Sequence, residues 1–208
     1  MTDLYPSIQY KIEKSIEAAD SKPDPSQWIV PISAAMFVST EFEEEIYAGS
    51  CKFYFIDVES SIDVSDYDPH SLLDIESTTS DFIELFDDSG HFTTEVIDVL
   101  QTDPFIRNMF VVDRVEIVHR FRGYGLAELA IKDAIYMFKN TAHVVGLKAY
   151  PLQMEPRPQI NDRYDHDELM SLDKFTCNDK DASRKLGSFY QGLGFKFIGT
   201  DGLMIKTC

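Results

Sequence analysis

The stretch HRFRGYGLAELA places two arginines and two glycines directly in front of a helix-forming run. The first N–H groups of a helix have no partner within it, and the helix dipole adds about half a positive charge there. Gly123 and Gly125 would let a bulky anion approach these donors, and Arg120 and Arg122 add positive charge and forked donors. The segment therefore predicts a phosphate or pyrophosphate site on the amides of residues 122–126. The alternative is a strand–helix corner whose glycines serve packing alone.

Other residues that could take part in chemistry give weaker predictions of a site. The glycine spacing matches neither G-x-G-x-x-G nor G-x-x-x-x-G-K-[ST], so neither a dinucleotide site nor a P-loop is predicted. The three cysteines form no C-x-x-C pair, which predicts no metal site and no disulfide framework. Cys51 lies in an apolar run and is predicted to be a small core residue. One polar segment is predicted to be a solvated loop, with acceptor binding as the alternative, although its side chains can bind metals: Asp162, Asp165, His166, Asp167 and Glu168.

The charge of the chain is large and unevenly distributed. A net charge of −17 argues against a nucleic-acid partner, because phosphate binding depends on Lys and Arg. Residues 41–103 contain 18 acids and one base, whereas residues 107–148 contain seven bases and four acids. The acidic stretch is predicted either to solvate a surface or to attract a cationic substrate.

No targeting or membrane segment is predicted. No apolar run approaches the roughly 20 residues that a membrane span requires. The N-terminus MTDLYPSIQYKIEK lacks the basic and then apolar pattern of a signal peptide. We therefore expect a cytoplasmic protein, and the sequence is compatible with a dimer.

The glycine-rich segment lies between a predicted strand and a predicted helix. The apolar run 108–118 predicts a strand, and 144–150 predicts another. Between them, residues 126–141 predict a helix whose apolar face includes Leu129 and Met137 and is widened by Ile131 and Ile135. A strand, helix and strand in this order predict a βαβ unit with parallel strands.

The remaining elements complete one mixed α/β domain over residues 1–208. The predicted strands are an edge strand at 8–16, a hairpin of 28–40 with 46–58, and a closing hairpin at 195–208. The predicted helices are a patchy one at 72–86 and shorter ones at 92–101 and 181–194. Residues 21–27 are predicted to be a turn or loop, and residues 57–71 a polar connection.

Two blocks of this sequence resemble the GNAT superfamily of N-acetyltransferases. The run from Arg120 to Ala127 resembles the acetyl-CoA signature R/Q-x-x-G-x-G/A in two overlapping registers. The later block SRKLGSFYQGLGFKFIG resembles the family element N-x-x-A-x-x-[LF]-Y-x-x-[LF]-G-F. Both blocks occur in the family's order and together cover about residues 109–199.

The resemblance has departures. Ser183 stands where the family usually has Asn, and Leu186 stands where it has Ala. The predicted helices of the first half follow the hairpin, whereas in the family they follow the first strand. Residues 1–105 are a divergent N-terminal half, outside the two matching blocks, that is expected to shape the acceptor side, and the resemblance implies that residues 106–208 form the acetyl-CoA-binding half.

The resemblance implies transfer of an acetyl group from acetyl-CoA to an amine of a small molecule or peptide, by direct attack in a ternary complex. It implies a mixed, mostly antiparallel sheet flanked by helices, with a parallel strand pair that separates near Ile117. A backbone N–H of Ile117 or Val118 would polarise the thioester carbonyl. The implied acetyl-CoA contacts are Ile117, Val118, Arg120, Arg122, Gly123, Tyr124, Gly125, Leu126, Ala127 and Ser183.

Three residues are candidates for proton transfer. The resemblance implies Tyr190 as the general acid, and the alternative is a tyrosine that packs beside Phe189. Glu116 is a candidate base or water-orienting residue, and the alternative is an ion pair with Arg114 on the same strand face. His119 is a lower-ranked base that is otherwise expected at the surface.

Two classes of function stay open at this point. The first is an acetyl-CoA-dependent N-acetyltransferase with an amine acceptor, for which the acidic stretch suggests a cation. The second is a non-catalytic acyl-CoA-binding or protein-interaction module on the same fold. Neither class requires a metal.

Overall fold

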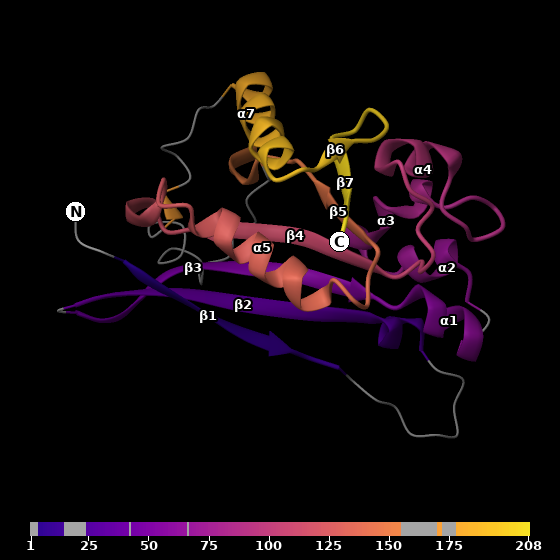
Figure 1. The fold of residues 1–208 in the computed structure, drawn as a ribbon, viewed down its shortest axis with the longest axis horizontal. Helices are drawn as coiled ribbons and strands as arrows, with labels where there is room; N and C mark the ends of the chain where they lie inside the picture. Colours follow the sequence, from indigo (N-terminus) through magenta and orange to yellow (C-terminus); the bar gives the residue numbers. More distant parts are fainter. Residues whose placement is uncertain (1–3, 15–23, 42, 66, 155–169, 172–177) are drawn as a thin grey trace.

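The computed structural model describes residues 4–14, 24–41, 43–65, 67–154, 170–171 and 178–208. In this part of the chain seven strands form one sheet, in the order β1-β2-β3-β4-β5-β7-β6 (Figure 1). All neighbouring strands are antiparallel except β4 and β5, which are parallel. This confirms the mixed, mostly antiparallel sheet. The strands are β1 (Tyr5–Ile12), β2 (Ile29–Thr40), β3 (Glu43–Ile56), β4 (Met109–Ile117), β5 (Val144–Lys148), β6 (Lys196–Phe197) and β7 (Leu203–Thr207).

The first three strands match the predicted hairpin and edge strand. From Val30 to Val38 of β2 every second residue is buried, because successive side chains of a strand point to opposite faces. β1 lies at the edge of the sheet and ends at Ile12, earlier than predicted. The predicted loop at 21–27 overlaps the 3-10 helix η1 (Pro25–Trp28), and its first residues lie outside the described part of the chain.

The helices of the first half are short. They are α1 (Val58–Ser65), α2 (Pro69–Leu73), α3 (Ser77–Ser80) and α4 (Thr94–Leu100). The predicted helix at 92–101 is confirmed by α4, whereas the predicted helix at 72–86 is divided among α2, α3 and the 3-10 helix η2 (Ile83–Leu85). Among the described residues, no helix combines the length and the apolar character needed to cross a membrane.

The prediction of a polar connection at 57–71 was wrong, because this segment contains α1 and the start of α2. The Asp57 carboxylate accepts a hydrogen bond from the Ser60 N–H at 3.1 Å, an interaction typical of a helix N-terminus. Val58 and Ser61 are fully buried, and the Ser61 hydroxyl donates to the Val58 carbonyl at 2.8 Å. Few apolar residues are needed for so short a helix, so its polar composition concealed it.

Two apolar cores lie on opposite faces of the sheet. The helices α5 (Leu126–Phe138) and α7 (Asp179–Gly192) pack against one face, with buried side chains of β2, β3, β4 and β5. The helices α1, α2 and α4 pack with the other core, and Figure 1 shows α1 to α4 gathered at one end of the sheet. One end of the second face is therefore covered by helices.

The predicted βαβ unit is confirmed, but α5 is rotated relative to the prediction. Leu129 and Met137 were predicted to lie on its apolar face, yet both are exposed. Ile131 and Ile135, predicted on the flank, are buried in the core. The packing partner decides the rotation, because this helix is apolar around more than half of its circumference.

Candidate functional site

β4 and β5 pair along only part of β4. The parallel register runs from Met109 opposite Val144 to Val112 opposite Leu147. β4 continues to Ile117 in register with β3, whereas its pairing with β5 ends at Val112. The two strands therefore separate beyond Val112, and the second half of β4 has one neighbouring strand.

A β-bulge marks the point of separation. Lys52 in β3 lies opposite Arg114 and Phe53 opposite Val112, so Asp113 is an extra residue in β4. Such a bulge bends a strand and increases its twist. Beyond it, Gly49 in β3 allows a close approach, because a Cβ there would lie 2.2 Å from the Glu116 carbonyl oxygen. The sequence analysis did not identify this glycine.

The register decides which amides of β4 face the gap. The Val118 N–H donates to the Ala48 carbonyl at 2.9 Å, so it points toward β3. Hydrogen-bonded and non-hydrogen-bonded pairs alternate along an antiparallel ladder, which directs the amides of Val115 and Ile117 away from β3. In agreement, the Ile117 carbonyl accepts a hydrogen bond from the Arg122 side chain at 3.0 Å. Of the two predicted carbonyl-polarising donors, Ile117 is the one with this orientation.

The start of α5 is open. Gly123 and Gly125 have φ angles of 84° and 78°, a left-handed conformation that favours glycine. A Cβ added at either position would meet no atom of the described chain within 4 Å. Gly125 is the N-cap residue, and its described surroundings provide no side-chain cap hydrogen bond. The amides of residues 126–128 precede the first hydrogen bond within the helix, which runs from the Leu129 N–H to the Gly125 carbonyl at 3.0 Å.

Arg122 connects this corner to the rest of the site. Its Nε donates to the Ile117 carbonyl, and its Nη2 donates to the Met170 carbonyl. Burial lowers the pKa of the guanidinium from its ordinary value, but an arginine remains charged under all ordinary conditions. Arg122 therefore brings positive charge to the corner and holds it against the end of β4.

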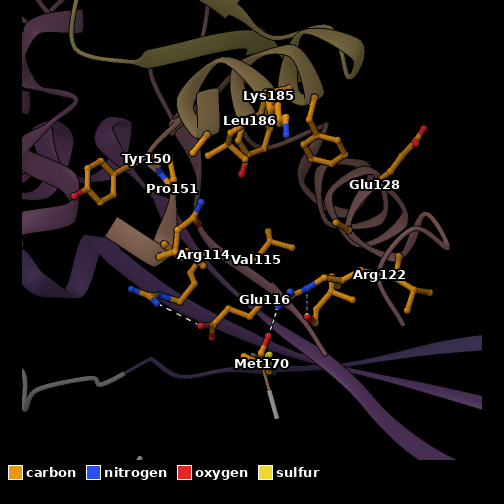
Figure 2. A pocket seen from close by; sticks show the side chains of 18 of the residues that line it. Arg114, Val115, Glu116, Arg122, Glu128, Tyr150, Pro151, Met170, Lys185 and Leu186 are labelled. Carbon is orange, nitrogen blue, oxygen red and sulfur yellow. Dashed lines mark hydrogen bonds and ion pairs between the residues drawn. The ribbon is translucent and has the colours of Figure 1, made fainter. Parts of the chain in front are cut away.

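A cavity of about 650 Å³ joins the separated strands to the start of α5. It is lined by residues 113–117 of β4, by the α5 corner, by one face of α7 and by residues 150–153. Figure 2 shows Lys185 and Leu186 above the cavity on α7, with Val115 below them on β4. Two groups of hydrogen-bond donors, the amides of β4 and those of α5, thus open onto one space.

Tyr190 lines the cavity from α7. It is 9% exposed, and its ring makes edge contacts with Phe189 and Phe195 at centroid distances of 5.2 and 5.9 Å. Burial raises the pKa of its phenol to about 12. Tyr190 therefore packs against aromatic neighbours, as one alternative predicted, and also presents a protonated side chain at the cavity wall.

Glu116 lines the cavity and forms the predicted ion pair. Its Oε1 lies 3.4 Å from Nη1 of Arg114, as the dashed line in Figure 2 shows. The Glu116 side chain is 9% exposed and the Arg114 side chain 31%. His119 is exposed in the 3-10 helix η3 (His119–Phe121) and is not among the lining residues.

The structure brings some of the predicted contact residues to the cavity wall. Those that line it are Ile117, Arg122, Gly123, Gly125, Leu126 and Ala127. The lining set does not contain Val118, Arg120, Tyr124 or Ser183. The Arg120 guanidinium lies over the ring of Phe121 at 4.7 Å, and Ser183 is exposed.

Apart from Tyr190, the residues on the cavity-facing side of α7 were not predicted as site residues. This side consists of residues at helical spacing, namely Ala182, Lys185, Leu186, Phe189 and Tyr190. Counted from Ala182, these residues follow the i, i+3, i+4, i+7 and i+8 pattern of one helix face, and Ser183 is not on that pattern. The loop with the metal-capable residues 162–168 lies outside the described residues. The prediction that Cys51 is a core residue is confirmed, because it is 4% exposed.

Among the described residues, the carboxylates that line the cavity are all in ion pairs. Glu116 pairs with Arg114, Asp113 lies 3.4 Å from Lys52, and Glu128 lies 2.6 Å from Lys132. The exposed Lys185 adds a cation at the α7 side. None of the described residues that line this cavity comes from the acidic stretch 41–103. The electrostatic setting is therefore compatible with an anionic ligand.

Comparisons with known proteins do not assign this sequence to a family. No protein-family model matches this sequence, and no curated protein matches it. The resemblance to the GNAT superfamily consequently depends on the two sequence blocks described above.

Proposed function

We propose that this chain is an acetyl-CoA-dependent N-acetyltransferase that acts on an amine of a small molecule or peptide. One observation supports this most strongly: the open start of α5 and the separated half of β4 face the same cavity. A ligand with a diphosphate at one end and an extended amide-bearing arm at the other requires both features.

The α5 corner suits the diphosphate. The amides of residues 126–128 and the helix dipole favour an anion, and the space beside Gly123 and Gly125 is open to it. Arg122 and Lys185 add positive charge from two sides of the cavity. Charge-assisted hydrogen bonds to phosphate are about twice as strong as neutral ones.

The separated half of β4 suits the pantetheine arm. An extended chain with amide groups can pair with a strand edge that has lost its neighbour. The amides of Val115 and Ile117 face that edge, and the Ile117 N–H is the donor that would polarise the thioester carbonyl.

The cavity residues supply the proton transfers of a direct attack. The nitrogen of the amine forms a bond to the acetyl carbon, and the bond from that carbon to sulfur breaks. Glu116, directly or through a water molecule, accepts the proton that leaves the ammonium. Tyr190, which is protonated at neutral pH, donates a hydrogen bond and a proton to the departing sulfur, and the second proton that the acylated nitrogen loses restores the phenol. Holding both reactants in one cavity supplies much of the rate.

The donor site is tested by titrating acetyl-CoA into the purified protein and measuring heat and the shift in Tm. The wild type is expected to bind, and Gly125→Ala is expected to lose about tenfold or more in affinity, because its Cβ occupies the phosphate position. Gly199→Ala is the matched control: its φ of 60° imposes the same left-handed strain, but it lies in the β6–β7 turn. No heat and no shift with the wild type would exclude the proposal, as would equal losses in both variants.

Turnover separates the enzyme from a binding module. The wild type is incubated with acetyl-CoA and a broad panel of amines, and acetylated products are identified by mass spectrometry. Product formation that Tyr190→Phe slows supports the transferase. Tight acetyl-CoA binding with no product from any amine would favour the binding module.

A further inference from the structure

A second cavity of about 530 Å³ lies over the first strands of the sheet. It exists because the strands carry small residues there: Ser33 and Ala35 of β2 and Ser50 of β3 line it. Ala35 lies opposite Ser50 in the β2–β3 register, so these small side chains are neighbours. Gln9 of β1 and Tyr47 of β3 add polar groups to the lining.

The charged side chains among the described lining residues of this cavity are cations, and each is in an ion pair with a carboxylate outside the lining: Lys11 with Glu13, Lys52 with Asp113 and Arg114 with Glu116. The described lining residues contain no Asp or Glu. Lys52 is the single base of the acidic stretch 41–103. Among the described lining residues, the acidic stretch therefore provides its only base and none of its carboxylates, although the whole chain has a net charge of −17.

The second cavity adjoins the first at Arg114, which lines both. Arg114 and Lys52 each pair with a carboxylate that lines the first cavity: Glu116 lies beside Arg114, and Asp113 lies beside Lys52. In the strand register Lys52 is opposite Arg114 and Ser50 is opposite Glu116. Glu116 in the first cavity and the cations Lys52 and Arg114 of the second cavity are thus adjacent on the neighbouring strands β3 and β4.

We propose that the second cavity receives an anionic group of the acceptor, so that the acceptor is an amine that also bears a carboxylate, such as an amino acid. Its amine lies beside Glu116 in the first cavity, and its carboxylate contacts Lys52 and Arg114, with Ser33 and Ser50 as hydroxyl donors. A guanidinium and an ammonium are the groups that proteins use to bind carboxylates. This inference rests on the proposed transferase function and differs from the cationic acceptor that the acidic stretch suggested.

The test compares amino acids with their decarboxylated amines, for example lysine with cadaverine and tyrosine with tyramine, in the presence of CoA or acetyl-CoA. The readouts are the shift in Tm and kcat/KM. For at least one pair, the wild type is expected to favour the amino acid by about tenfold or more, since one charged hydrogen bond is worth about this factor. An aminoalkyl phosphate in the same assay distinguishes a phosphate site from a carboxylate site.

The matched variants are Lys52→Met and Lys139→Met. Lys52→Met keeps the aliphatic stem and is expected to reduce the preference for the amino acid by about tenfold without altering CoA affinity. Lys139 is exposed at the end of α5 and lines neither cavity, so its variant is expected to keep the wild-type preference. A merely structural role of Lys52 would slow both members of a pair equally.

The outcomes separate this inference from the proposed function. A protein that binds CoA but neither binds nor acetylates any amino acid of the panel would overturn the inference and leave the donor site intact. Preference for the decarboxylated amines, or an unchanged preference in Lys52→Met, would also overturn it. Failure to bind CoA would instead overturn the proposed function.

Discussion

The two halves of β4 differ in their neighbours although they belong to one strand. Met109–Val112 has β3 on one side and β5 on the other, and all four residues are buried. Asp113–Ile117 is half-buried and lines the cavity, and within it Arg114–Ile117 pairs with β3. The bulge at Asp113 is the boundary.

The comparison shows how a sheet can become a binding site without a new element. In the first half, the ladder on both sides satisfies the backbone groups. In the second half, the loss of one neighbour leaves amides facing a cavity, where a donor without a partner costs about 1–3 kcal/mol if it is buried from water. A ligand or water must satisfy these groups, so we expect the first half to serve stability and the second half to serve binding.

The largest expected difference between the halves is in stability. Phe110 is fully buried and stacks on Phe53 and Phe138 at centroid distances of 5.3 and 4.8 Å. Phe110→Ala is expected to lower the free energy of unfolding by about 3–5 kcal/mol, measured by urea denaturation. Val115→Ala, in the half-buried second half, is expected to cost about 1 kcal/mol. Equal losses would contradict the division of β4 into two roles.

The next largest effect is expected for Tyr190, which faces the second half of β4 from α7. Tyr190→Phe is expected to lower kcat by about 100-fold, as for loss of a positioned proton donor, with CoA affinity within twofold of wild type. Because the pKa of Tyr190 is about 12, its ionisation is expected to cause no loss of kcat below pH 10. Tyr136→Phe, at an exposed position of α5 outside the lining, is the control. Wild-type kcat in Tyr190→Phe would reduce this tyrosine to a packing role.

Glu116 tests whether the second half of β4 takes part in the chemistry. Glu116→Gln is expected to reduce kcat/KM for the amine by about tenfold, while acetyl-CoA binding measured by calorimetry stays unchanged. The free energy of unfolding is expected to change by less than about 1 kcal/mol, because Arg114 in the ion pair is partly exposed. Unchanged turnover would leave Glu116 as a partner of Arg114 alone.

The smallest effect is a change in the pH dependence of stability, and it concerns Cys51 of β3, which lies opposite Val115 of β4. Burial, followed by the charge of Glu116, raises the pKa of its thiol from 9.0 to about 12. The pKa of this thiol is higher in the folded state than in the unfolded state. Its contribution to the free energy of unfolding is therefore fully present below pH 9 and is lost as the pH rises toward 12. Between pH 9 and 10 the loss is about 1 kcal/mol. Urea denaturation at several pH values should show a shallower decline for Cys51→Ala than for wild type; parallel declines would contradict this.

Much of the fold followed from local patterns. Alternation in β2 and β3, the apolar runs of β4 and β5, and the helix between them predicted the hairpin and the parallel pair. The helix α1 was missed because its polar residues outweigh Val58, and the rotation of α5 was wrong because apolar residues surround much of that helix. In both cases the decisive contact is with a distant segment.

Local sequence accounts for the open corner, because the left-handed glycines and the helix start are local properties of residues 123–126. The predicted range of open amides was wrong at Arg122, whose N–H donates to the His119 carbonyl at 3.3 Å. The sequence also determined which residue types were available for chemistry. Strand register and packing specify where β4 leaves β5, which face of α7 meets the cavity, and that Lys52, the single base of the acidic stretch, lies opposite Arg114. These features depend on contacts between segments far apart in the chain, which local residue patterns do not specify.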